Sequence, residues 1–160
     1  MKVSVVMGSA SDKPVGDKVI KILEEFGVEN ELRVISAHRT PYVAKEFAEN
    51  AEEKGTEVIV AIAGKAAHLA GVLAGISPLP VIGVPAKSST MDGLDSLLSV
   101  VQMPKGVPVA TVAIDGGENA GLLAVQILSV KYHELREKFK AYKVRMAEET
   151  IKADEELNQK

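Results

Sequence analysis

A histidine and an arginine stand side by side in the segment Ser36-Ala37-His38-Arg39-Thr40-Pro41. An imidazole titrates near neutral pH and can carry a proton, whereas a planar guanidinium can bind a phosphate through two parallel hydrogen bonds. Thr40 and Pro41 suit the N-cap and the first turn of a following helix. At the end of a strand, His38 and Arg39 would combine acid–base catalysis with anion binding, although a single histidine is more often structural.

A second polar segment, Gly8-Ser9-Ala10-Ser11-Asp12, follows the first apolar stretch of the chain. Its glycine allows a ligand close to the backbone, and the free N–H groups of a helix start favour an anion. The hydroxyls of Ser9 and Ser11 are suitable donors for phosphate oxygens, whereas the Asp12 carboxylate can accept hydrogen bonds from ribose hydroxyls. Alternatively, Ser11 or Asp12 simply caps the helix.

The third candidate is a loop of small residues, Ala63-Gly64-Lys65-Ala66-Ala67-His68-Leu69-Ala70-Gly71. Small side chains let a planar ring lie against the backbone, whose N–H groups can bind a carboxylate or CO2. His68 either belongs to such a site or is only a polar residue in the first turn of a helix. A fourth polar loop, residues 85–93, could serve as a lid, whereas we expect His133 to be inert on a solvated tail.

These segments must be positioned by short apolar stretches that alternate with stretches of helical period. Strands are predicted at residues 3–7, 31–36, 57–61, 80–84 and 107–114, because these stretches are nearly continuous in apolar residues, as central parallel strands are. Helices are predicted at residues 15–26, 43–51, 69–76, 94–101 and 119–130, the last deeply buried. Five βα units predict an α/β fold with a three-layer, doubly wound parallel sheet, flavodoxin-like, in the order 2-1-3-4-5.

The chain after residue 130 differs from the rest. It is rich in Lys, Glu and Ala, and its apolar residues Leu135, Phe139, Tyr142 and Met146 recur at helical spacing. We therefore expect an α/β catalytic domain at residues 1–130 and a C-terminal amphipathic helical extension of it at residues 131–160. That helix could pack on its own domain. Because five helices already cover the sheet, we favour contacts with a neighbouring subunit of a homo-oligomer.

Composition excludes several classes of partner. A chain of 160 residues that is 46% hydrophobic suits one domain, and a net charge of −3 argues against nucleic acid as a partner. There is no cysteine, and no His, Asp or Glu spacing resembles a metal site. No stretch approaches the roughly 20 apolar residues of a membrane span, and the first apolar run is too short for a secretory leader. We expect a cytoplasmic protein without a metal or membrane partner.

Five segments together resemble the phosphoribosylaminoimidazole carboxylase/mutase family of de novo purine synthesis, in the family's order and spacing over essentially the whole chain. They are Met7-Gly8-Ser9-Ala10-Ser11-Asp12, Ser36-Ala37-His38-Arg39-Thr40-Pro41, Ala66-Ala67-His68-Leu69, Gly93-Leu94-Asp95-Ser96-Leu97 with Val101-Gln102-Met103-Pro104, and Gly106-Val107-Pro108-Val109-Ala110-Thr111.

One branch of that family moves the carboxylate of N5-carboxyaminoimidazole ribonucleotide to ring carbon C4, and the other carboxylates aminoimidazole ribonucleotide with free CO2. Arg39, Pro41 and His68 resemble the first, mutase branch. Lys65 and Ala70 depart from it, because they stand where mutases commonly have glycine and proline. Lys65 either corresponds loosely to an arginine of the other branch or simply points to solvent.

The resemblance implies an isomerase without a cofactor, which releases CO2 and recaptures it, in a homo-oligomer that is typically an octamer. It implies His38 as the catalytic acid and base, with His68 in support. The ribonucleotide substrate would be bound at its phosphate, ribose and imidazole by Ser9, Ser11, Asp12, Ser36, Arg39, Gly64, Lys65, Ala66 and Gly71. Two alternatives stay open, a carboxylase that uses CO2 directly and a non-catalytic nucleotide- or flavin-binding module.

Overall fold

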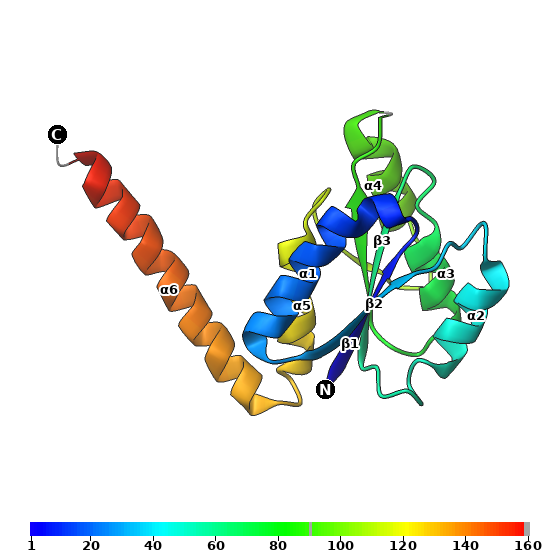
Figure 1. Ribbon diagram of the computed structural model, residues 1–160, viewed down its shortest axis with the longest axis horizontal. Coiled ribbons are helices and arrows are strands. Elements are labelled where there is room, and N and C mark those ends of the chain that lie inside the picture. Colours follow the sequence, from blue (N-terminus) through cyan, green and yellow to red (C-terminus); the bar gives the residue numbers. More distant parts are fainter. Residues whose placement is uncertain (90, 159–160) are drawn as a thin grey trace.

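A five-stranded parallel sheet forms the centre of the computed structural model, which describes residues 1–89 and 91–158 (Figure 1). The strand order is β2-β1-β3-β4-β5, as predicted, and every neighbouring pair is parallel. This confirms the three-layer, flavodoxin-like α/β fold. The strands are β1 (Lys2–Met7), β2 (Glu29–Val34), β3 (Val58–Gly64), β4 (Val81–Ala86) and β5 (Ala110–Thr111).

Helices cover both faces of the sheet. On one face lie α1 (Lys13–Phe26) and α5 (Gly117–Leu128), and on the other lie α2 (Pro41–Asn50), α3 (Leu69–Ile76) and α4 (Leu94–Val101) (Figure 1). The neighbours Val5 and Val6 are both completely buried, one in each of the two cores. A strand alternates its side chains between faces, so burial on both faces explains the continuous apolar runs of the central strands.

The bounds of the strands differ from the predictions: β3 ends three residues and β4 two residues later than expected, and both outer strands differ as well. β2 begins and ends two residues earlier than expected, and Val34 at its end is 55% exposed, because an edge strand needs less apolar sequence than a central one. β5 is only two residues long instead of eight. Pro108 lacks the N–H that a paired strand needs, although Val112 and Asp115 still donate backbone hydrogen bonds to the chain of β4. The helix predicted at residues 119–130 is α5, which is buried along one side only and leaves Gln126 exposed.

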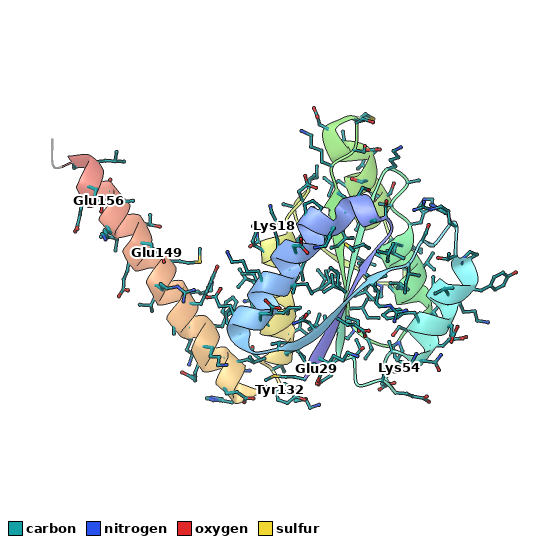
Figure 2. The ribbon with its side chains drawn as sticks, viewed as in Figure 1. Lys18, Glu29, Lys54, Tyr132, Glu149 and Glu156 are labelled. Atoms are coloured by element: carbon teal, nitrogen blue, oxygen red, sulfur yellow. The ribbon has the colours of Figure 1, made fainter. Side chains whose placement is uncertain are left out.

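The last helix, α6 (His133–Asn158), begins on the domain and then leaves it (Figure 1). Leu135 is completely buried, and the rings of Phe139 and Tyr142 lie 6.0 and 5.6 Å from the ring of Phe26. Every residue from 143 to 158 is exposed, and Figure 2 shows the labelled Glu149 and Glu156 on this projecting part. In the described parts of the chain, no helix has both the length and the apolar character to cross a membrane.

Candidate active site

Four parallel strands place their following loops around one pocket at the carboxyl edge of the sheet. Its volume of about 560 Å³ suits a small ligand. Every site residue proposed from the sequence lines it except Gly71. The lining comprises Gly8, Ser9, Ser11, Asp12, Ser36, Ala37, His38, Arg39, Ala63, Gly64, Lys65, Ala66, His68, Leu69, Lys87 and Ser88.

The loop after β1 is held by its own polar groups. Ser9 is the N-cap of a short 3₁₀ turn, η1 (Ala10–Asp12): its Oγ accepts from the Ser11 N–H at 3.3 Å and from the Ser11 hydroxyl at 2.9 Å. The Ser9 N–H in turn donates to Asp12 Oδ2 at 3.1 Å. The capping residue is thus Ser9, and neither Ser11 nor Asp12 caps α1 with its side chain. Ser9 and Ser11 both still line the pocket while they make these capping bonds.

The carboxyl group of Asp12 is held in an unusual state. Burial raises its pKa above the ordinary value of 3.8, and the nearby carboxylate of Asp115 adds to the rise. Hydrogen bonds from Ser9 and Ser11 and the charge of Arg39 oppose this rise without cancelling it. Asp12 is therefore an acidic group whose charge is destabilised until a ligand supplies further hydrogen-bond donors.

The loop after β2 is tied to the loop after β1 through Arg39. Its backbone N–H and its Nε donate to Ser36 Oγ at 3.1 and 3.4 Å, and its Nη2 donates to the carbonyl of Gly8 at 2.9 Å. These bonds fix the plane of the guanidinium at the pocket. Thr40 occupies the N-cap position of α2 as predicted, but its hydroxyl bonds to the backbone of Ser36 rather than to the helix.

His38 and His68 are in direct contact, although they are 30 residues apart in sequence. His38 Nε2 lies 2.9 Å from His68 Nδ1, and the two rings are nearly perpendicular at 82°. Both residues are exposed at the pocket, unlike a histidine that serves the core. In this hydrogen bond one of the two nitrogens donates a proton and the other accepts it. The bond therefore cannot form when His38 Nε2 and His68 Nδ1 both carry a proton.

The loop after β3 turns sharply at Lys65. Lys65 has a φ of 56°, in the left-handed region that favours glycine, and its carbonyl accepts from the N–H of Ala67 at 2.8 Å. The N–H of His68 likewise donates to the carbonyl of Ala66, so neither of these two donors is free for a carboxylate. Lys65 is exposed and is one of the residues that line the pocket.

Sequence reasoning missed Lys87 and Ser88, which line the pocket from the loop after β4. That loop was predicted as a lid without a residue being singled out, and its Thr90 lies outside the described residues. The Lys87 N–H donates to Asp115 Oδ1 at 2.8 Å, and its Nζ lies 3.2 Å from Asp92 Oδ1. The sequence signal was weak, because the predicted strand ended at residue 84, whereas Lys87 directly follows the observed β4.

Two other candidates lie away from the pocket. Gly71 is within α3 and does not line the pocket; a Cβ there would lie 2.9 Å from Met103 Cε, so the end of the Met103 side chain would have to shift. His133 is exposed at the start of α6, as expected. Across residues 1–89 and 91–158, no group of three or more His, Cys, Asp or Glu side chains is placed to hold a metal ion.

Comparisons with known proteins agree with one another. A family model described as AIR carboxylase matches residues 2–149. A Thermotoga maritima protein named N5-carboxyaminoimidazole ribonucleotide mutase is 56% identical over 158 residues, covering 99% of this chain and 92% of that protein. A Pyrococcus abyssi protein of the same name is 61% identical over 142 residues, covering 89% and 82%. The crystal structure of Treponema denticola PurE is 30% identical, with a TM-score of 0.90 and 99% of both chains covered.

Proposed function

The chain belongs to the AIR carboxylase family, and we propose that it is an N5-carboxyaminoimidazole ribonucleotide mutase of purine biosynthesis. This isomerase moves a carboxylate from the exocyclic nitrogen of an aminoimidazole ribonucleotide to ring carbon C4. The observation that carries the proposal is the 2.9 Å contact between His38 and His68 inside a ligand-sized pocket. Its support is the high identity to relatives that bear this name over most of both chains.

The ribonucleotide would lie along the carboxyl edge of the sheet. Its phosphate would be bound by the hydroxyls of Ser9, Ser11 and Ser36 and by the guanidinium of Arg39, whose fixed plane suits two parallel hydrogen bonds. The ribose hydroxyls would donate to Asp12, which would stabilise its carboxylate form. The imidazole would then lie over the small residues Gly64 and Ala66, and Gly71 would support that loop through its packing on Met103.

His38 would act as both acid and base. Protonated His38 gives its proton to the exocyclic nitrogen while the bond from that nitrogen to the carboxylate carbon breaks, which releases CO2. The enamine-like carbon C4 then attacks CO2, and a carbon–carbon bond forms. Neutral His38 finally removes the proton from C4, which restores the aromatic ring and regenerates the acid. Protons and electrons balance within one turnover.

His68 would keep His38 in the required state. In the 2.9 Å contact, His68 Nδ1 can hold the proton when His38 is neutral or accept the hydrogen bond when His38 is protonated. His38 gives a proton to the substrate in the first step and takes one back in the last. It therefore needs a neighbour that can hydrogen-bond to both its protonated and its neutral form. Recapture depends on keeping CO2 beside C4, so proximity and exclusion of water supply most of the acceleration.

We further propose that the protein is a homo-oligomer, for which the family resemblance implies an octamer, and that residues 131–160 contribute to its contacts. The support is the projecting half of α6, where Val144, Met146, Ile151 and Leu157 are 57, 47, 58 and 78% exposed. A neighbouring subunit would also help to enclose a pocket whose histidines are exposed in one chain. We place the enzyme in the cytoplasm, because its phosphorylated substrate is charged and does not cross a membrane freely.

The proposed function is tested with purified protein and no ATP. N5-carboxyaminoimidazole ribonucleotide is supplied in bicarbonate-free buffer, and the uncarboxylated ribonucleotide is supplied separately with bicarbonate. We expect fast formation of the C4-carboxylated product from the first substrate, and from the second only at high bicarbonate. The reverse preference would identify a carboxylase that uses CO2 directly. If neither substrate reacts while nucleotide still binds, the protein is a binding module.

A further inference from the structure

Two lysines leave the centre of the sheet side by side. In the pairing of β3 with β4, Gly64 lies opposite Ala86, and the next residues of the two strands are Lys65 and Lys87. Neighbouring strands are about 4.8 Å apart, so the two residues emerge close together. Both line the same pocket. The chain as a whole carries a net charge of −3, so this is a local concentration of positive charge in an acidic protein.

The fold by itself does not favour these two lysines. Lys65 has a φ of 56°, a conformation that glycine adopts more easily than lysine, and its ammonium has no ion pair or hydrogen bond within residues 1–89 and 91–158. The ammonium of Lys87 contacts Asp92, but that carboxylate is 89% exposed, and exposed ion pairs contribute little. Like charges at adjacent strand ends repel. An anion between them would relieve that repulsion.

The loops that carry the two lysines and the loop that carries Arg39 enter the pocket from opposite ends of the row of strands, although the Arg39 guanidinium reaches back to the carbonyl of Gly8 after β1. In the sheet order β2-β1-β3-β4, Arg39 and Ser9 lie in the loops that follow the first two strands. The two lysines lie in the loops that follow the last two. The contact between His38 and His68 joins the loops after β2 and β3, and so lies between these ends. The pocket therefore suits a ligand with two separated anionic groups and its reacting centre between them.

We propose that Lys65 and Lys87 form a carboxylate-binding subsite that distinguishes carboxylated from uncarboxylated aminoimidazole ribonucleotide. This rests on the proposed function, in which the phosphate occupies the Arg39 end. The substrate and the product both carry a carboxylate next to the imidazole, whereas the uncarboxylated ribonucleotide does not. Because the lysines attract the carboxylate before and after transfer, they contribute mainly to binding rather than to the chemical step.

The backbone of Lys87 is positioned for this role by Asp115. Asp115 Oδ1 accepts the Lys87 N–H at 2.8 Å, and the N–H of Asp115 donates to the carbonyl of Pro85 at 2.9 Å. These two bonds hold the start of the fourth loop against the segment that follows β5. The ammonium can then exchange Asp92 for a ligand carboxylate by rotation of its side chain alone, because the backbone beneath it is fixed.

The test compares the affinities of two ligands for the intact protein by calorimetry. The ligands are the C4-carboxylated and the uncarboxylated aminoimidazole ribonucleotides, and the variants are Lys65→Gly and Lys87→Gln. Each variant should weaken binding of the carboxylated ligand roughly tenfold, the scale of one charge-assisted hydrogen bond, and change the other Kd less than twofold. The KM of the carboxylated substrate should rise with kcat nearly unchanged. Lys13→Gln is the matched control, because Lys13 is paired with Asp17 outside the pocket.

Equal weakening of both ligands would overturn the subsite, because the lysines would then act on the phosphate or through the overall field. An unchanged affinity for both ligands would also overturn it, and a selective loss in only one variant would overturn the pairing. Glycine suits the backbone at position 65 and Lys87 is exposed, so both variants should fold, which thermal unfolding checks. If the unsubstituted protein binds neither ribonucleotide, the proposed function itself fails before any variant is considered.

Discussion

The carboxyl edge of the sheet and the second half of α6 both expose charged side chains, but their local organisation differs. At the sheet edge, Arg39 bonds to Ser36 and Gly8, and His38 contacts His68. Beyond Tyr142, α6 has one ion pair with the domain, from Arg145 to Glu25 of α1, and two within its own turns, and it exposes an apolar side chain every few residues. At the sheet edge, contacts within one chain hold the polar side chains in place. In the tail, by contrast, no other part of the described chain covers the apolar side chains.

This difference indicates which properties each region controls. Substitutions at the sheet edge should change catalysis and binding in proportion to the contacts they remove, with little effect on assembly. Changes in the tail should alter assembly first, and should alter catalysis only if neighbouring subunits complete the pocket.

The largest expected effect is that of His38→Gln. Glutamine keeps a polar side chain near His68 but cannot transfer a proton, so turnover should fall about 10²–10⁴-fold while ribonucleotide affinity changes little. Steady-state kinetics and calorimetry on the same preparation measure the two quantities. Arg39→Ala is the matched contrast, because it should mainly weaken binding. Turnover of His38→Gln near the unsubstituted rate would remove His38 from the mechanism.

The second prediction concerns a chain that ends after Val144. It keeps Leu135, Phe139 and Tyr142, which anchor α6 on the domain, so it should fold but form a smaller oligomer. Light scattering measures the mass. In the full chain, Ile151→Ser should weaken assembly, whereas Lys152→Ser should not, because both residues are exposed but only the first is apolar. An unchanged mass after truncation would show that the tail is not an assembly surface.

The sequence predicts the central part of this architecture better than its margins. β1, β3 and β4 are buried on both faces, and their nearly continuous apolar runs make them recognisable in the sequence. β2 and β5 lie at the edges, where burial constrains the sequence less, and their predicted bounds were wrong. His38, Arg39 and Lys65 could be named because their residue types are unusual in the short loops between a strand and a helix, even where the strand bounds were not exact.

Contacts that depend on strand order could not be read from the sequence alone. The closeness of His38 to His68 requires β2, β1 and β3 to be neighbours, and that of Lys65 to Lys87 requires the register of β3 with β4. In its own loop, Lys87 looks like any other lysine in a polar connection. Gly71 does not line the pocket, and the sequence does not distinguish a small residue that faces a ligand from one that faces a neighbouring side chain, here Met103.

The third prediction uses the pH dependence of stability at the sheet edge. Because the folded protein raises the pKa of Asp12 above 3.8, its charged form destabilises the fold at neutral pH, and this penalty disappears as the pH falls through the raised pKa. Asp12→Asn keeps an acceptor for the Ser9 N–H and carries no charge. Urea unfolding should find this variant more stable than the parent at pH 7, with the difference shrinking towards pH 4. A difference independent of pH would contradict the assignment.

The smallest expected effect is on stability in Lys65→Gly. A left-handed φ costs a non-glycine residue about 1 kcal/mol or more, whereas glycine loses roughly 0.4–1 kcal/mol through its more flexible unfolded chain. The variant should therefore be more stable by about 0.5 kcal/mol, a rise in Tm of about 1–2 °C. Lys45→Gly is the control, since Lys45 is an exposed helical residue of α2 and its replacement should lower stability by roughly 0.5–1 kcal/mol.

A stabilised Lys65→Gly protein would sharpen the contrast between the two regions. It would mean that the sheet edge retains a lysine where its own backbone favours glycine, so the reason for the lysine must lie outside the folded chain, in what the pocket binds. The tail would show the opposite relation, with a regular helical backbone and apolar side chains that are exposed in the single chain. If Lys65→Gly instead lowers Tm as much as Lys45→Gly, the backbone at position 65 does not favour glycine, and the stability of the folded chain gives no reason to expect a ligand there.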